Sequence, residues 1–145
     1  MAVISYIGAT IAVCVGSPAT IDQSGFAAVG TYVVAGSIVS WDGTGDQSED
    51  VTVTTLAGRT LHANGAKDGG AIAFTLQYEL ADPGQVIVRA QSNSNNDVCV
   101  RITDPDGKIE YSVGRMASVK QMPRTAGAYK GMEGQFRVNS AVVTV

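Results

Sequence analysis

Few residues of this chain could carry out chemistry. His62 is the only histidine among 145 residues, and no acidic residue is placed by the sequence to orient it, so a catalytic Ser–His or Cys–His arrangement is not indicated. Cys14 and Cys99 are the two cysteines, and without a CxxC spacing they indicate neither a metal site nor a redox motif. The N-terminal residues lack the positive charge of an export signal, so we expect both thiols to be reduced. The sequence therefore predicts that the protein is not an enzyme.

Three loops invite an ion-binding interpretation. The Gly- and acid-rich stretch at 42–50 and the DPDG turn at Asp104 both lack the residue order of a calcium loop, since Lys108 stands where the third ligand of the second loop should be. The stretch HANGAKDGG at 62–70 contains Lys67 but has no GK[ST] motif, which a phosphate-binding loop requires. We therefore expect no metal, cofactor or catalytic site.

The hydrophobic pattern predicts that the secondary structure consists mostly of strands. The composition, with 17 glycines, 16% charged and 6% aromatic residues, is typical of a Gly-rich all-β protein, and 145 residues suit a single domain over 1–145. Extended segments are predicted over 10–15, 31–41, 51–61, 71–80, 85–91, 98–103, 108–113 with a prolongation to 119, and 135–145. The four segments from 71 to 113 are predicted to form an antiparallel meander.

The last hairpin of this meander allows a prediction of register. A four-residue loop at 104–107 would place Thr103 opposite Lys108 and Arg101 opposite Glu110. The apolar residues of both strands would then share one dry face, and both cysteines would lie opposite the apolar sets of their strands. The Arg101–Glu110 pair is expected to select this register.

The remaining segments are predicted to be a short helix and three loops. Ser17 can cap a helix that has Pro18 at its first position. The loops are predicted at 41–50, 55–70 and 121–134. A loop as long as the last is usually functional or becomes ordered on a partner.

The charges are distributed unevenly along the chain. The formal net charge is -3, and no Lys or Arg precedes Arg59, whereas five acidic residues do. The net charge gives no basic surface for nucleic-acid binding. The two halves could attract each other within one subunit or between subunits, or the acidic stretch could be an ordinary solvated loop.

Several sequence blocks follow one another in a recognisable order. They are SPATIDQSGFAAVGTYVVAGSI at 17–38, HANGAKDGG at 62–70, DPGQVIVRAQS at 82–92, DPDGKIEYSVGRMASV at 104–119 and FRVNSAVVTV from 136. In their order and spacing, over nearly the whole chain, they resemble the small tail tube (major tail) proteins of long-tailed bacteriophages and related gene-transfer particles. One departure is Ser37 in AGSIVSW, where the family pattern leads us to expect an acid, so an acidic lumen contact at that place is in doubt.

The resemblance implies an antiparallel β-sandwich or partial barrel with one short helix. Six copies would close a hexameric ring whose sheets join into a continuous β-barrel, and stacked rings would form a tail tube that conducts the genome into the host. The protein would be a self-assembling structural component of the virion tail, assembled in the host bacterial cytoplasm. Its partners would be copies of itself, the tape measure, tail terminator and distal tail proteins, and DNA as transient cargo, without a membrane.

The three predicted loops are the candidate contacts between rings, because flexible loops above and below a ring can hold the next ring. The candidate contact residues are Asp42, Asp46, Glu49, Asp50, Arg59, His62, Lys67, Asp68, Arg124, Tyr129, Lys130 and Glu133.

Other structural roles remain open at this stage. The inner tube of a secretion or contractile machine, such as the type VI secretion tube, would be built from stacked rings in the same way. A tail terminator or a capsid decoration protein would form capping rings or trimers without open-ended stacking.

Overall fold

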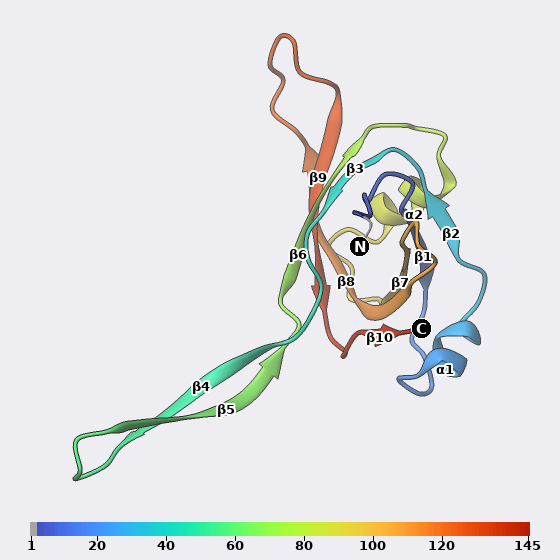
Figure 1. Ribbon diagram of the computed structural model, residues 1–145. Coiled ribbons are helices and arrows are strands. Elements are labelled where there is room, and N and C mark those ends of the chain that lie inside the picture. Colours follow the sequence, from blue (N-terminus) through green and yellow to red (C-terminus); the bar gives the residue numbers. More distant parts are fainter. Residues whose placement is uncertain (1–2) are drawn as a thin grey trace.

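The computed structural model describes residues 3–145, and its regular structure consists mainly of strands (Figure 1). The elements in chain order are β1 (Thr10–Val15), α1 (Gln23–Ala27), β2 (Val33–Ala35), β3 (Ile38–Trp41), β4 (Gln47–Thr54), β5 (Thr60–Asp68), β6 (Ala71–Gln77), α2 (Pro83–Ala90), β7 (Val98–Thr103), β8 (Ile109–Gln121), β9 (Gly131–Val138) and β10 (Val143–Thr144). The predicted all-β fold is confirmed. The described residues form two helices, whereas one was predicted.

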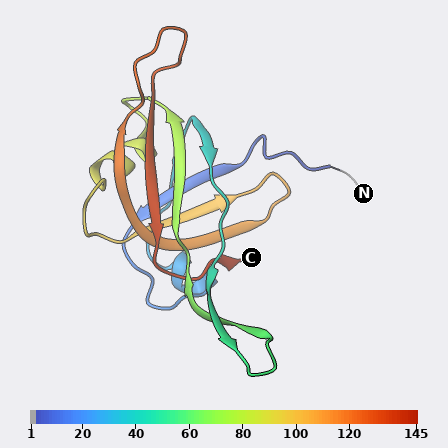
Figure 2. The same cartoon turned by 90° about the vertical axis from the view of Figure 1, so that its left-hand side faces the viewer.

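The main sheet curls into a partial barrel (Figures 1 and 2). Eight antiparallel strands form it in the order β2-β1-β7-β8-β9-β6-β3, with β10 beside β8. Only Gly36 and Ser37 separate β2 from β3, so both ends of this path belong to one bent segment. Ser37 has a φ of 59°, which breaks the strand predicted over 31–41 into two. The predicted meander is wrong in two respects: β9 lies between β6 and β8, and its second segment, 85–91, is not a strand.

Helix α2 covers the bend between β2 and β3, and it replaces a predicted strand. Residues 85–91 were predicted to be extended, but 85–90 form most of α2. Asp82 caps the helix, since its Oδ1 accepts the backbone N–H groups of Gly84 and Gln85 at 3.0 and 3.1 Å. Pro83 occupies the first turn, where its missing N–H costs nothing. A Cβ at Gly84 would lie 2.4 Å from the Cα of Ala35, so only glycine allows this close approach.

Both faces of the sheet are covered by apolar side chains. The inner core gathers side chains from six elements: Ile11, Val13, Ile72, Phe74, Leu76, Val88, Val98, Val100, Met116, Met132, Phe136 and Val138. A second core lies on the outer face of β1, β7 and β8 and contains Cys14, Phe26, Cys99, Tyr111 and Val113. Phe26 of α1 is fully buried there and stacks on Tyr111 at 5.4 Å between ring centroids. The expectation of one dry and one wet face is therefore wrong for this part of the sheet.

The predicted register of the β7–β8 hairpin is wrong by one residue. Thr103 pairs with Ile109 and Arg101 with Tyr111, so Arg101 and Glu110 do not face each other. Gly107 has a φ of 95°, and the N–H of Asp104 donates to the Lys108 carbonyl at 2.8 Å. This glycine-containing bulge makes the connection one residue longer than predicted. Consequently Tyr111 lies in the second core together with both cysteines. The prediction that the cysteines lie on the face opposite the inner apolar residues is confirmed.

The helix predicted at Ser17 and Pro18 begins later. Asp22 caps α1, since its Oδ1 accepts the Gly25 N–H at 2.7 Å and the Thr20 hydroxyl at 2.9 Å. The strand predicted at 10–15 and the prolongation of the 108–113 strand are both confirmed. The segment 135–145 is not one strand, since β9 ends at Val138 and the two-residue β10 follows a turn.

Two of the predicted loops are largely strands. β4 takes up residues 47–50 of the loop predicted at 41–50 and continues to Thr54, and β5 occupies more than half of 55–70, so these stretches form one long hairpin. The third loop is shorter than predicted, because β8 runs to Gln121 and β9 begins at Gly131. This connection, residues 122–130, is named the β8–β9 loop below.

Candidate assembly interface

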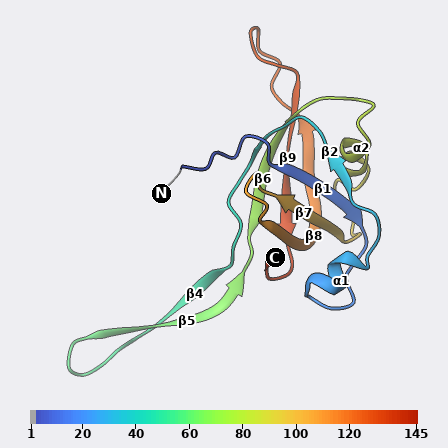
Figure 3. The same cartoon turned by 45° about the vertical axis from the view of Figure 1, so that its right-hand side comes forward.

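The β4–β5 hairpin and the β8–β9 loop project from opposite ends of the barrel. Figures 1, 2 and 3 show this in three orientations: the hairpin leaves the lower end of the body and the β8–β9 loop the upper end. A molecule with different projections at its two ends can make the same contact repeatedly with further copies. These two projections are the candidate site.

The hairpin is built from alternating sequence and a glycine turn. β4 contains the run VTVT at 51–54, whose β-branched residues favour strands. Gly58 has a φ of 82° and donates its N–H to the Thr55 carbonyl at 2.9 Å, and Thr55 in turn donates to the Arg59 carbonyl at 3.0 Å. Leu56 stands fully exposed at the tip of this turn.

One face of the hairpin is apolar and uncovered. Val51 pairs with Ala63 and Val53 pairs with Leu61, and directly paired residues share a face. Val51, Val53 and Leu61 are 52%, 60% and 49% exposed. The apolar face is defined here as Val51, Val53, Leu61 and Ala63.

The opposite face of the hairpin is polar. Thr52 pairs with His62 and Thr54 with Thr60, whose hydroxyl oxygens lie 3.1 Å apart. His62 Nδ1 lies 3.1 Å from both carboxylate oxygens of Asp50, and both side chains are exposed. The sequence did not place an acid beside His62, because the pairing of β4 with β5 creates this contact. An exposed pair of this kind contributes little to stability.

The hairpin receives no support from the barrel. β4 and β5 form a two-stranded sheet of their own, and all residues of both strands except Gly65 are exposed. An isolated two-stranded hairpin is marginally stable in water. Its outer backbone edges are also available for pairing with another chain.

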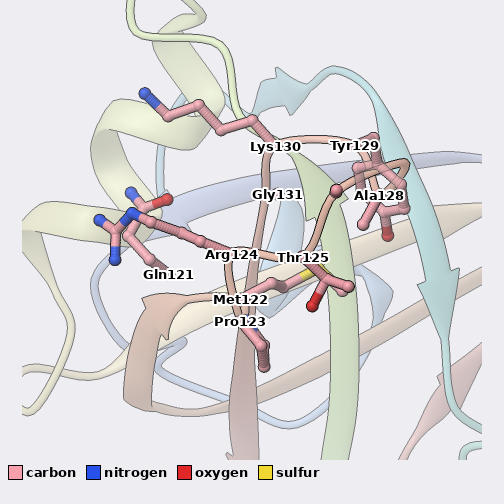
Figure 4. A pocket seen from close by; sticks show the side chains of 10 residues that line it. Gln121, Met122, Pro123, Arg124, Thr125, Ala128, Tyr129, Lys130 and Gly131 are labelled. Atoms are coloured by element: carbon pink, nitrogen blue, oxygen red, sulfur yellow. The ribbon is translucent and has the colours of Figure 1, made fainter.

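The β8–β9 loop lines an open pocket of about 470 Å³ (Figure 4). The loop is anchored at its base, because the Met122 N–H donates to the Gly131 carbonyl and the Tyr78 N–H donates to the Lys130 carbonyl, both at 3.0 Å. The Lys130 ammonium lies 4.6 Å from the centroid of the Tyr78 ring. Figure 4 shows Arg124 directed to one side of the loop and Tyr129 to the other.

The structure divides the predicted contact residues between the two ends. Asp42 and Asp46 lie in the connection from β3 to β4, and the hairpin carries Glu49, Asp50, Arg59, His62, Lys67 and Asp68. Arg124, Tyr129 and Lys130 lie in the β8–β9 loop. Glu133 is not part of a loop; it lies in β9, where Lys120 Nζ is 3.7 Å away.

The two ends differ in charge. Residues 42–68 carry five acidic and two basic residues, and residues 122–130 carry Arg124 and Lys130 without any acid. The two ends therefore carry net charges of opposite sign.

Sequence reasoning missed the apolar contact surfaces. The apolar face of the hairpin was signalled by the alternation VTVT, but the stretch 62–70 was interpreted as a loop. Near the N-terminus, Val3, Ile4, Tyr6 and Ile7 are also exposed, in a segment that leaves the barrel sideways (Figures 2 and 3). Exposed apolar groups of this number mark interaction surfaces.

A second cavity, of about 330 Å³, lies between β3 and the β7–β8 hairpin. The indole N–H of Trp41 is buried beside it without a hydrogen-bond partner. Across residues 3–145 no cluster of three or more His, Cys, Asp or Glu side chains is arranged to hold a metal ion. None of the described helices has the length and hydrophobicity needed to cross a membrane.

No protein-family model and no curated protein sequence matches this chain. Among solved structures, a chain of the six-fold symmetrised anti-feeding prophage baseplate matches with a TM-score of 0.63 and 9% identity, covering all of this chain and 96% of that one. The anti-feeding prophage tube-terminating cap gives 0.61 and 10% identity, covering 100% and 91%. The extended sheath–tube complex of an extracellular contractile injection system (PVC) gives 0.58 and 11% identity, covering 93% and 87%. The chain thus shares its fold with chains of contractile injection systems.

Proposed function

We propose that this protein is the repeating subunit of the tube in a phage-tail-like particle. Six copies close a ring, and rings stack into a tube that serves as a conduit for delivery of the genome. The observation that carries this proposal is the β4–β5 hairpin, which has an exposed apolar face and, among the described residues, pairs with no strand of the barrel. The shared fold supports the same role, and one of the matching structures is a six-fold symmetrised assembly.

The apolar face of the hairpin is the contact between neighbouring copies in a ring. Covering the exposed parts of Val51, Val53 and Leu61 stabilises a contact by about 1 kcal/mol per side chain. Each ring offers six such contacts, and closure of the ring leaves no copy with an uncovered hairpin. When the ring closes, the exposed backbone edges of each hairpin also pair with a neighbouring copy.

Stacking of rings uses the opposite charges of the two ends. The acidic residues 42–50 of one ring face Arg124 and Lys130 of the next, so that each interface matches unlike charges. Such exposed contacts weaken as salt concentration rises. Tube length is therefore more sensitive to salt than ring formation is.

A tube terminator is the second candidate function. A sheath/tube terminator of the extracellular contractile injection system matches with a TM-score of 0.59 and 11% identity, covering 93% of this chain and 92% of that one, and the tube-terminating cap matches similarly. A terminator stops at one ring, whereas a tube subunit stacks without a fixed limit.

The hairpin contact is tested by a pair of variants on adjacent residues of β4. Val53→Asp places a charge on the apolar face, and Thr52→Asp places the same charge on the polar face. We expect Val53→Asp to abolish rings in sedimentation and electron microscopy, while its monomer keeps the melting temperature of the wild type, because residue 53 is exposed there. Thr52→Asp should still assemble. Normal rings from Val53→Asp would exclude the apolar face as the ring contact.

A further inference from the structure

Cys14 on β1 and Cys99 on β7 stand directly opposite each other. They are register partners in the antiparallel ladder, and both are free thiols. Directly paired residues in such a ladder have Cα atoms about 4.5–5.5 Å apart. This range falls within the Cα separation of about 4.4–6.8 Å found in disulfides.

The two sulfurs lie on the same face, within the second core. The Cys99 thiol donates to the Gly16 carbonyl at 3.3 Å, and the Cys14 thiol donates to the adjacent Val15 carbonyl at 3.8 Å. Both thiols are therefore directed toward the same end of β1. The Cβ atoms of directly paired residues lie about 4.5–5.5 Å apart, and those of a disulfide lie about 3.5–4.5 Å apart, so a small approach of the two strands joins the thiols.

The surroundings keep both groups protonated. Burial raises the pKa of the Cys14 thiol. Burial, together with negative charge at Cys14 and Asp97, raises the pKa of Cys99 to about 11, although a hydrogen bond with Tyr32 opposes this change. Since the thiolate is the reactive form, the pair reacts slowly at neutral pH.

Access to the pair comes from the side of Cys14. Cys14 is 7% exposed and Cys99 is fully buried. The segment that follows α1 covers Cys14, and a Cβ at Gly30 would lie 3.2 Å from its sulfur. An oxidant that reaches the pair therefore meets Cys14 first, when this segment moves.

We propose that Cys14 and Cys99 form an oxidation site at which a small disulfide, such as oxidised glutathione, creates a cross-strand disulfide. The Cys14 thiolate attacks one sulfur of the oxidant and releases the first glutathione thiolate. The Cys99 thiolate then attacks the Cys14 sulfur of this mixed disulfide and releases the second. The two protons of the cysteines end on the two glutathione thiols, so the protein loses two hydrogens and the oxidant gains them.

The product fixes β1 to β7, which are distant in sequence but adjacent in the sheet. A bond between residues 14 and 99 closes a loop of roughly 85 residues in the unfolded chain, and long loops give large stabilisation. We expect the melting temperature to rise by on the order of 10 °C. This inference does not depend on the proposed tube function.

The test uses the full chain, purified with reductant, transferred to pH 8.5 and incubated with oxidised glutathione. Intact mass, free-thiol titration and a non-reducing gel are expected to show a monomeric chain that has lost two hydrogens and both thiols, with a raised melting temperature that reductant reverses. Cys99→Ser should stop at the mixed disulfide and gain the mass of one glutathione. Cys14→Ser should react more slowly than Cys99→Ser, because its remaining thiol is fully buried.

Wild type unfolded in urea serves as the positive control for the oxidant. Folded wild type that keeps both thiols while the unfolded control reacts would overturn the proposal. Glutathione on both cysteines, an intermolecular disulfide, or an internal disulfide that leaves the melting temperature unchanged or lowers it would also overturn it.

Discussion

Glu110 is held by two neighbours beside the second cavity. Its carboxylate lies 2.8 Å from the Lys108 ammonium and accepts a hydrogen bond of 2.7 Å from the Thr44 hydroxyl. Burial by itself would raise the pKa of Glu110, but the hydrogen bonds from Lys108 and Thr44 and the charge of Lys108 outweigh it and lower the pKa. The sequence predicted Arg101 as the partner of Glu110, and this prediction is wrong, because Arg101 pairs with Tyr111.

This environment predicts an acid-dependent loss of stability. A carboxyl whose pKa is lower in the folded state than its ordinary value of 4.5 stabilises the fold fully above that value. The contribution is lost as pH falls from about 4.5 through the lower, folded-state pKa. We expect the melting temperature of wild type to fall more steeply in this window than that of Glu110→Gln. The exposed residue Glu49, changed to Gln, provides the control and should leave the wild-type profile unchanged; a Glu110→Gln profile parallel to wild type would contradict the account.

At the scale of elements, α2 closes the barrel through one buried side chain. Gln85 is fully buried, and its Nε2 donates to the carbonyls of Gly36 and Gln77 at 2.8 and 2.9 Å. Its Oε1 accepts the Glu79 N–H at 2.9 Å. Gln85 thus connects α2 to the bend between β2 and β3 and to the end of β6.

Gln85→Leu keeps the size of the side chain and removes all three hydrogen bonds. Buried polar groups that lose their partner cost about 1–3 kcal/mol each, so we expect the free energy of unfolding to fall by about 3 kcal/mol or more. Urea denaturation provides the measurement. Val86→Ala, on the half-exposed side of the same helix, is the control and should cost less than about 1 kcal/mol. Equal losses for the two variants would show that Gln85 does not close the barrel.

The sequence predicted the strands that obey simple alternation, and β1 and β7 match their predicted bounds. It failed for α2, where Val86, Val88 and Ala90 alternate as in a strand, although Asp82 and Pro83 form a helix start. The register of β7 and β8 was wrong because a single dry face was assumed. Both faces are buried, so apolar residues at successive positions could not decide between the two registers.

The candidate site was predicted in part. Most charged residues of the two projections were named from their loops, because glycine, asparagine and charge mark exposed segments. Their separation to opposite ends depends on tertiary structure and could not be predicted from spacing. The apolar face of the hairpin was missed, since the strand character of 60–68 is hidden by Asn64, Gly65 and Ala66.

At the scale of the whole molecule, the partial barrel has a buried core and its two projections are exposed. The inner core is closed by α2, whereas the hairpin exposes an apolar face and both edges. The hairpin and the β8–β9 loop lie at opposite ends and carry opposite charge (Figure 1). In the proposed assembly, each copy would cover the exposed hairpin of a neighbour.

Electron microscopy of the purified wild-type protein across a range of concentrations, with mass measurement of the same samples, tests this account most directly. We predict six-fold rings that stack into open-ended tubes as the concentration rises. Single rings that never stack would support a terminator and contradict the tube. A protein that stays monomeric at every concentration, also when other tail components are added, would contradict the account as a whole.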